Sequence, residues 1–219
     1  LNGNDMIIGN TGGAVELYHI NNRKIFTTSF GTQISCGPDG DGLKLEGTTN
    51  RIDLVANTNR SGATNTILEL DAHWNNTSVA FMAFATGDDT TNKDDGIIRF
   101  FTKPSGGTIA ERLRIASDGK IGINIAGSDN TSPVRNLDIA DSSGAILRLI
   151  STDDSLGANE RVGEIEFYTD DDDAAHVSSN IKAIAEASDA YGRRGALTFG
   201  TRSDSGNASE KVRIDHMGR

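Results

Sequence analysis

The sequence predicts an all-β, repeat-containing protein, and three observations support this fold class. Short runs of alternating apolar and polar residues, bounded by Gly, Asn, Asp and Ser, recur along the 219 residues, which is the pattern of half-buried strands between turns. The phrase ERLRIASDGKIGI, which begins at Glu111, returns in part as EKVRIDHMGR at Glu210. Only 36% of the residues are hydrophobic and 5% are aromatic, so stacked repeats or partner subunits are needed to bury the apolar faces.

The N-terminal region, residues 1–47, is predicted to be a shaft-like β-hairpin module followed by a glycine-rich link. Strand patterns begin at Val15, and Asn21-Asn22 and Phe30-Gly31 predict turns on either side of a second strand. Asn and Gly favour such turns because they tolerate positive φ at low cost. The link that closes this module is Gly37–Gly42.

Two β repeat units are predicted to follow, at residues 48–130 and 131–219, and the second is truncated at its end. Alternating runs predict strands at residues 43–45, 51–54, 67–70, 147–149 and 163–167. Residues 181–187 could form a helix, because Ile181 and Ile184 have helical spacing, but the face that they begin continues only into small residues. In a chain this rich in strands we favour a strand there.

A shift of 99 positions aligns the ends of the two units without a gap. Gly96–Thr102 then matches Gly195–Thr201, and Glu111–Ile115 matches Glu210–Ile214. Glycines, alternating apolar residues and a charged pair all stay in register, so we interpret the match as a duplication.

Further upstream the two units are related with less regular spacing. We pair residues 52–54 with 137–139, 68–70 with 147–149, and 79–84 with 162–167. The second unit is longer between Thr169 and Gly195, where the ambiguous residues 181–187 are expected to add a strand at an exposed edge. The repeat stops at Arg219 inside a pattern that continues after Gly119, so we expect a piece of a longer polypeptide.

Charge and composition exclude several partners. The formal net charge is −10, which repels a phosphate backbone or an anionic membrane surface, so nucleic acid is not expected as a partner. Cys36 is the only cysteine, so no intrachain disulfide can form. No apolar run approaches the roughly 20 residues needed to cross a bilayer, and we expect no membrane insertion.

Two phrases resemble a known family. GGAVELYHINNRKIFTTSFGTQIS, from Gly12 to Ser35, resembles a repeated module in tail fibres and other virion appendage proteins of tailed bacteriophages, particularly marine and cyanobacterial ones. The phrase that begins at Glu111 is similar to a unit that recurs along those fibres, although Asn124 and Ile125 stand where a glycine-threonine segment usually follows. The resemblance covers most of the chain in fragments, and its motifs are structural rather than catalytic.

The resemblance implies an elongated homotrimer in which strands of three chains wrap a common axis, with slender shaft and wider knob-like β domains. It implies a structural and adhesive role in host attachment, as an exposed extracellular appendage of the virion. The implied partners are the chain itself, other virion tail proteins, and a host-surface glycan or protein receptor. In such a trimer, apolar residues of the repeated phrase are expected to point to the axis (Leu113, Ile115, Ile121, Ile123) and charged ones to face water (Arg112, Arg114, Lys120).

Three side chains are candidates for glycan contact: Trp74, His73 and Tyr191. An exposed aromatic face stacks on the apolar face of a pyranose, while Asn and Asp side chains bond its hydroxyls. Trp74 lies in the polar, loop-like phrase DAHWNNTS. Packing in a core or an interface is the alternative for this residue.

No cofactor and no metal site is expected. The run Asp170–Asp173 could bind Ca²⁺ through carboxylate oxygens, but consecutive acids point in different directions along a strand and no EF-hand spacing is present. A solvated acidic loop is therefore favoured. The same reasoning favours a turn at Asp39 and Asp41.

No enzymatic activity is predicted, because the four histidines lie far apart without an HExxH motif and no GxSxG motif occurs. Two alternatives stay open. One is a tailspike-type enzyme that degrades a polysaccharide with two carboxylates brought together in space. The other is a subunit of a cellular surface filament or adhesin with the same repeat architecture.

Overall fold

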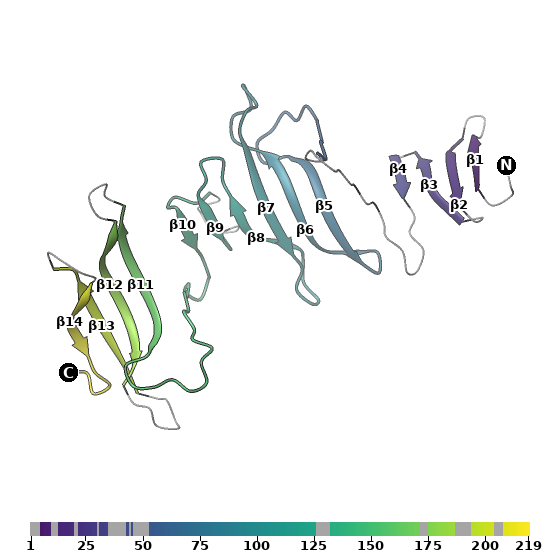
Figure 1. Ribbon diagram of the computed structural model, residues 1–219. Coiled ribbons are helices and arrows are strands. Elements are labelled where there is room, and N and C mark those ends of the chain that lie inside the picture. The colour runs from purple at the N-terminus through teal and green to yellow at the C-terminus, as the bar shows by residue number, and fades with distance from the viewer. Residues whose placement is uncertain are drawn as a thin grey trace. The chain divides into compact units, whose positions relative to one another are not determined.

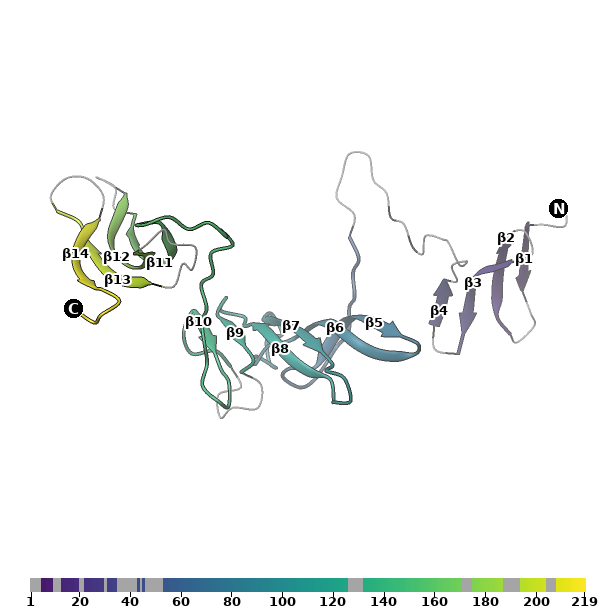
Figure 2. The same ribbon diagram turned by 90° about the horizontal axis from the view of Figure 1, so that it is seen from below.

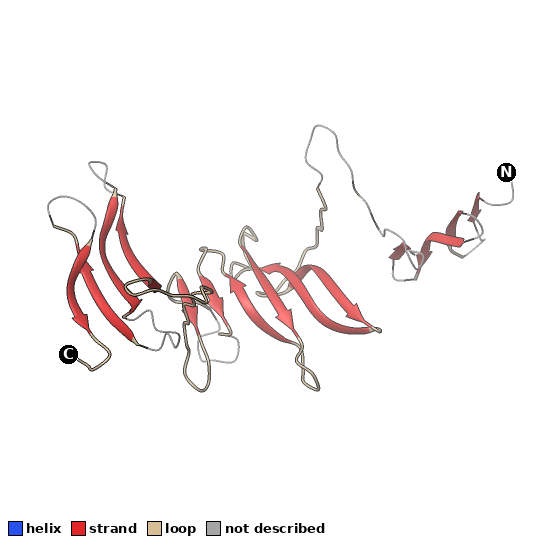
Figure 3. Ribbon diagram, turned by 60° about the horizontal axis from the view of Figure 1, so that its bottom comes forward, coloured by secondary structure: helices blue, strands red, loops and turns tan. Residues whose placement is uncertain are grey.

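The structure is a computed structural model, and it describes residues 5–9, 13–19, 22–29, 31–34, 43, 45, 53–125, 132–170, 175–186, 194–203 and 208–219. Within these ranges the regular structure is fourteen strands in three sheets, without a helix (Figure 1 and Figure 3). The all-β prediction is confirmed. No helix of the described ranges has the length and apolar character to span a membrane. The chain divides into two compact units, Leu1–Arg60 and Ser61–Arg219.

The first unit contains one antiparallel sheet in the order β1-β2-β3-β4. Its strands are β1 (Asp5–Gly9), β2 (Val15–His19), β3 (Asn22–Thr28) and β4 (Gly31–Ile34). The strands predicted after Val15 and around both turns are confirmed, and β1 adds a strand that was not predicted. One apolar row crosses the whole sheet on one face: Ile7, Leu17, Ile25 and Ile34.

The second unit begins with a six-stranded sheet in the order β10-β9-β8-β7-β6-β5, whose strands lie side by side in one layer (Figure 2). Its strands are β5 (Thr66–Trp74), β6 (Thr77–Thr86), β7 (Gly96–Thr102), β8 (Ala110–Ile115), β9 (Ile121–Ile123) and β10 (Leu137–Ile139). The pairs are antiparallel except β9 with β10, which is parallel.

The second unit also contains a four-stranded antiparallel sheet, with strands β11 (Arg161–Thr169), β12 (His176–Ala185), β13 (Gly195–Thr201) and β14 (Ser209–Ile214). The strand predicted at residues 181–187 is confirmed as part of β12. Its expected place at an exposed edge is wrong, because β12 lies between β11 and β13.

The duplication extends to the backbone pairing. At a shift of 99 residues, the pair Ala85–Ile97 becomes Ile184–Ala196. An irregular pairing after Phe100 also recurs after Phe199. β6, β7 and β8 thus correspond to β12, β13 and β14, strand for strand and register for register.

All three upstream parts of the sequence alignment are wrong. Residues 137–139, which we paired with 52–54, form β10, whereas Asp53 and Leu54 lie outside strands. β5 corresponds to β11 at a shift of 95 residues, because Thr64 and Asn159 make the same backbone bonds to the strand that follows. Residues 79–84 therefore match 178–183, and 68–70 match 163–165. The extra residues of the second repeat lie between Thr169 and His176, the connection that holds the acidic run.

The strand predicted at residues 147–149 does not form. This segment lies outside the strands, because no neighbouring strand of the same chain supplies a hydrogen-bonding ladder for it. Asp53 and Leu54, and likewise Leu43 and Leu45, also lie outside strands, and the rest of those two predicted runs falls outside the described residues.

The predicted domain limits stay a prediction. The limit between residues 130 and 131 falls outside the described residues, and β10 beyond it pairs with β9.

The apolar side chains of the repeated phrase share one face, as expected, because Leu113 lies opposite Ile123 and Ile115 opposite Ile121. The expectation that Arg114 faces water is wrong, since Arg114 is buried and its guanidinium donates to Glu111. Arg112 and Lys120 are partly exposed.

Burial along β13 is the reverse of that in an ordinary half-buried strand. In β13, Ala196, Thr198 and Gly200 are buried, whereas Leu197 and Phe199 between them are exposed. The large apolar face is open to solvent in the single chain.

Candidate functional site

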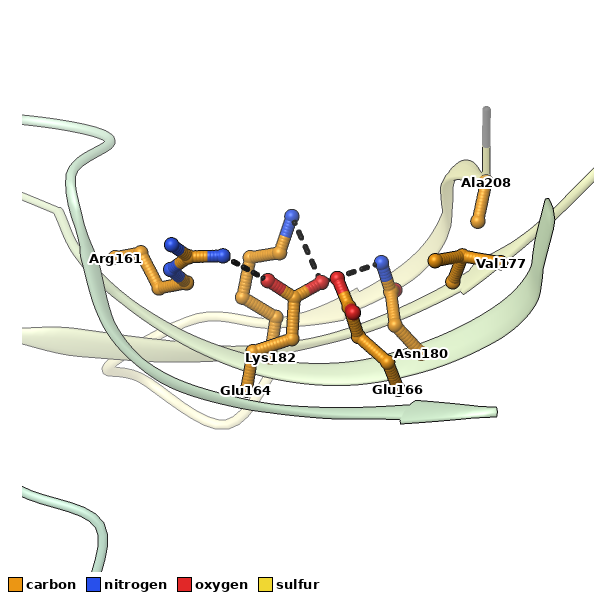
Figure 4. A pocket seen from close by; sticks show the side chains of 7 residues that line it. All are labelled: Arg161, Glu164, Glu166, Val177, Asn180, Lys182 and Ala208. Carbon is orange, nitrogen blue, oxygen red and sulfur yellow. Dashed lines mark hydrogen bonds and ion pairs between the residues drawn. The ribbon is translucent and has the colours of Figure 1, made fainter. Parts of the chain in front are cut away.

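A polar cavity of about 270 Å³ lies on one face of the sheet β11–β14. Figure 4 shows the side chains that line it, which point to one side of the strands. They are Arg161, Glu164, Glu166, Val177, Asn180, Lys182 and Ala208.

Strand register brings four of these side chains together. Glu164 of β11 lies opposite Lys182 of β12, and Glu166 lies opposite Asn180. Residues two apart in a strand point to the same face, so both pairs lie on the same side of the sheet.

Glu164 is the centre of the polar contacts. Its carboxylate accepts a hydrogen bond of 2.6 Å from Arg161 Nη1 and one of 2.7 Å from Asn180 Nδ2, and Lys182 Nζ lies 3.4 Å away. Its side chain is only 8% exposed. Burial acts to raise the pKa of Glu164, but the Arg161 hydrogen bond and the Lys182 charge outweigh it, and the pKa is lowered. Glu164 is thus held as a carboxylate.

Glu166 differs from Glu164 in its polar contacts. Among the described residues no hydrogen bond or ion pair reaches its exposed carboxylate. The two acids and two bases of the lining leave it with no formal net charge, yet both cations contact Glu164. Glu166 therefore remains able to accept hydrogen bonds from a ligand.

The cavity arises from two replacements between the repeats. In the first repeat Phe81 and Phe101 lie opposite each other and stack with ring centroids 4.1 Å apart. The equivalent residues of the second repeat are Asn180 and Gly200, which also lie opposite each other. Asn180 Oδ1 occupies the space where a Cβ of residue 200 would lie. Two aromatic rings of the first repeat are thus replaced by one amide side chain, and of these two positions only Asn180 lines the cavity.

A second cavity of about 170 Å³ continues the same polar face. It shares Asn180, Lys182 and Ala208 with the first cavity and extends to Glu210 and Arg213. The polar surface therefore crosses from β11 to β14.

Two of the three predicted site residues lie elsewhere, on the hairpin between β5 and β6. Trp74 ends β5, is 80% exposed, and does not pack in a core of this chain. His73 Nε2 lies 2.7 Å from Asp71 Oδ2, and Asp71 also accepts a bond from Ser78. Tyr191 lies outside the described residues. Glycan contact by these residues stays a prediction, as does interface packing of Trp74.

Sequence reasoning missed the polar cavity. The signal was present in the 99-residue shift, which aligns two phenylalanines with Asn180 and Gly200. Of the acidic run only Asp170 is described, and Asp39 and Asp41 also lie outside the described residues. No group of three or more metal-ligating side chains occurs within the described ranges.

No family model and no curated protein matches this chain. Solved structures that are similar to it are tail-fibre domains of a bacteriophage. One is the carboxy-terminal domain of the bacteriophage T5 L-shaped tail fibre, with 14% identity and a TM-score of 0.43 over 81% of this chain and 88% of that chain. The other is that domain with its intramolecular chaperone domain, with 17% identity and a TM-score of 0.41 over 81% of this chain and 61% of that chain.

These structures belong to the class that the sequence phrases resemble. They give no support to the marine or cyanobacterial type. At these identities and TM-scores they say nothing about the activity or partners of this chain.

Proposed function

We propose that the chain is a structural and adhesive segment of a trimeric tail fibre, or a related virion appendage, of a tailed bacteriophage. Its role is reach and attachment to the host surface through a glycan or protein receptor. The observation that carries the proposal is the exposed apolar face, which recurs in all three sheets.

The apolar faces are continuous across strands. In the six-stranded sheet one row joins all strands: Leu68, Phe84, Ile98, Ile115, Ile121 and Leu137. A second row runs beside it: Leu70, Met82, Phe100, Leu113, Ile123 and Ile139. Contiguous apolar patches of this kind mark interaction surfaces in soluble proteins.

The sheet β11–β14 repeats the arrangement. Its row Ile165, Ile181, Phe199 and Val212 occupies the positions of Leu70, Met82, Phe100 and Leu113. Phe167 and Val212 are 51% and 54% exposed, so this face has no cover in the single chain. Copies related by cyclic symmetry present the same face to a common axis, and together they would form the missing core.

Two extended segments add to the apolar surface. Leu54 and Val55 precede β5, and Leu149 and Ile150 precede β11 at the same shift of 95 residues. All four are exposed. Leu149 also lies against Gly163, at the edge of the apolar face. A neighbouring chain would supply the partner that these segments lack in the strand ladders.

Attachment in this proposal is multivalent. Three identical chains present the same loops and cavities, so modest contacts gain through effective concentration. Other tail proteins of the virion are the further partners, and a marine or cyanobacterial phage is the finer assignment that the sequence phrases favour.

An aspartate on the apolar face tests the proposal. Phe199→Asp should convert trimers to monomers, because three charges would meet where three aromatic rings are expected to pack, at a cost of at least about 2 kcal/mol per chain. Sedimentation velocity at micromolar concentration measures the change. Ser203→Asp, in an exposed position just beyond β13, is the control and should remain trimeric. If both variants behave like the unmodified chain, the apolar face is not the interface.

One observation favours the tailspike-type enzyme as a second candidate: Glu164 and Glu166 line the same cavity. Glycosidases need one carboxyl group as an acid and one as a base or nucleophile. The lowered pKa of Glu164 does not suit it to the acid role, and Glu166 is the other carboxyl group of the cavity. Release of reducing ends from a bacterial surface polysaccharide, lost in Glu166→Gln, would favour the enzyme over the adhesin.

A further inference from the structure

We infer that the polar cavity of the sheet β11–β14 binds an uncharged, hydroxyl-rich ligand of the size of one saccharide unit. The inference rests on the attachment role proposed above and names a site for it. It assigns the binding to the second repeat and to the face opposite the apolar one.

The cavity is a property of the side chains rather than of the fold. Both repeats have the same strand order and register, so the backbone beneath the cavity is the same. In the first repeat this place is filled by the stacked rings of Phe81 and Phe101. The cavity of the second repeat thus lies where the first repeat has an aromatic side chain, Phe81, in place of Asn180.

Neighbouring positions also differ between the two repeats. Ile109 is replaced by Ala208, which removes more bulk, and Ala83 is replaced by Lys182, which adds a donor. Thr66 is replaced by Arg161. The lining thus loses apolar bulk at residue 208 and gains two cationic side chains, whereas Glu164 and Glu166 have acidic counterparts in the first repeat, Glu69 and Asp71.

The charges of the lining favour an uncharged ligand. Arg161 and Lys182 balance Glu164 and Glu166, so neither an anion nor a cation gains from a net field. Glu164 is already satisfied by three donors. Glu166 accepts without a partner of its own among the described residues, and the two cationic groups have further N–H donors.

Saccharide hydroxyls match this arrangement, because each both donates and accepts. A hydroxyl can donate to Glu166 while its neighbour accepts from Arg161 or Lys182. The volume of about 270 Å³ lies near the lower end of small-molecule sites, at about 300 Å³, which suits one sugar unit.

Refilling the cavity gives the sharpest test. The double variant Asn180→Phe with Gly200→Phe introduces the aromatic pair that the same strand register holds in the first repeat. The new Cβ of residue 200 lies 3.2 Å from the backbone oxygen of Ser209, so β14 must shift slightly. The probes are the methyl glycosides of glucose, galactose, mannose and N-acetylglucosamine, and binding is measured by saturation-transfer NMR. At least one glycoside should bind the unmodified chain at millimolar concentration and lose its signal in the refilled variant. Glu166→Gln should weaken that binding about tenfold, since a hydrogen bond to a charged acceptor is replaced by a neutral one.

The matched control is Phe81→Tyr, which alters the closed face of the first repeat and should leave glycoside binding unchanged. Absence of binding by all four glycosides, or equal binding by the refilled variant, would overturn the inference. Sedimentation of the same samples separates the two proposals. A trimer that binds no glycoside contradicts the cavity alone, and a monomer that binds one contradicts the fibre assembly alone.

Discussion

At the scale of single residues, the repeated phrase places two charges where an ordinary strand would separate them. Glu111 and Arg114 are three apart, so in a regular strand they would point to opposite faces. Phe100 lies opposite Leu113 but Phe101 lies opposite Glu111, so Arg112 is an extra residue, a β-bulge. The bulge returns Glu111 to the face of Arg114, where two hydrogen bonds of 2.7 and 2.9 Å join them.

The second repeat forms the same pair between Glu210 and Arg213, at 2.8 and 2.9 Å. Its surroundings differ, because the Glu111 side chain is 6% exposed and the Glu210 side chain 41% exposed. The two copies thus form a natural comparison of one ion pair, buried and exposed.

Glu111→Ala should lower the free energy of unfolding of the first repeat by about 3 kcal/mol, because it leaves the buried Arg114 without its carboxylate. Glu210→Ala should have a much smaller effect, because water replaces the lost partner. Amide hydrogen exchange in β7 and β13 measures the loss of stability in each variant. Equal losses at the two sites would show that burial does not set the strength of this pair.

The carboxylate of Asp138 provides a prediction about pH. Its Oδ2 accepts bonds from the backbone N–H groups of Val134 and Arg135, and these hold its pKa below the usual value. A group whose pKa is lower in the folded state adds stability above its unfolded pKa, about 3.9, and loses it as the pH falls through the folded value.

Asp138→Asn imitates the protonated side chain. The variant should melt at a lower temperature than the unmodified chain at pH 7, and the difference should shrink below about pH 4. Thermal melts followed by circular dichroism at several pH values measure this. A difference that stays constant down to acid pH would mean that the charge of Asp138 does not stabilise the loop.

At the scale of elements, the turn after the bulged strand is the same in both repeats, as the strand itself is. Ala116 accepts from Gly119 N–H in the first repeat, and Asp215 accepts from Gly218 N–H in the second. Gly119 and Gly218 have φ of 82° and 80°, a region that side chains with a Cβ avoid. The turn therefore depends on glycine at that position.

Gly119→Ala should destabilise the first repeat by about 1 to 2 kcal/mol, through backbone strain alone, because no atom lies within 4 Å of the added Cβ. Urea denaturation followed by circular dichroism measures the change. Ser117→Ala in the same turn is the control and should change the midpoint little. An unchanged midpoint in Gly119→Ala would contradict the strain argument.

Alternating patterns in the sequence were sufficient to predict a strand where that strand has a hydrogen-bonding partner within the chain. β2 and β11 were predicted because alternation and turn residues agree there, whereas residues 181–187 were ambiguous and a strand was favoured because the chain is rich in strands. Residues 147–149 alternate equally well yet form no strand, since alternation does not reveal whether a hydrogen-bonding neighbour exists. The repeat was also paired wrongly upstream, because any two amphipathic strands look alike and only their register identifies them.

The candidate site could be predicted only in part for a related reason. Trp74 and His73 attracted notice as exposed polar and aromatic residues, and the structure places them on a hairpin tip. The cavity depends on Asn180 and Gly200, which are unremarkable residues in themselves. They stand out only in comparison with Phe81 and Phe101, which occupy the equivalent positions of the first repeat.

At the scale of the whole molecule, the proposed assembly uses the apolar face of each sheet. In the sheet β11–β14 the apolar row through Phe199 and the cavity beside Asn180 lie on opposite faces. Burying the first against other copies of the chain leaves the second at the outside. One fold repeated along the chain can then serve both cohesion and attachment.

The mass of the unmodified chain in native solution tests this account most directly, because the account requires the apolar faces to be covered by other copies. Native mass spectrometry or light scattering at micromolar concentration measures it. The account predicts a mass of three chains, each of 23.2 kDa. A stable monomer would contradict it and would leave the apolar rows exposed in the protein's working form.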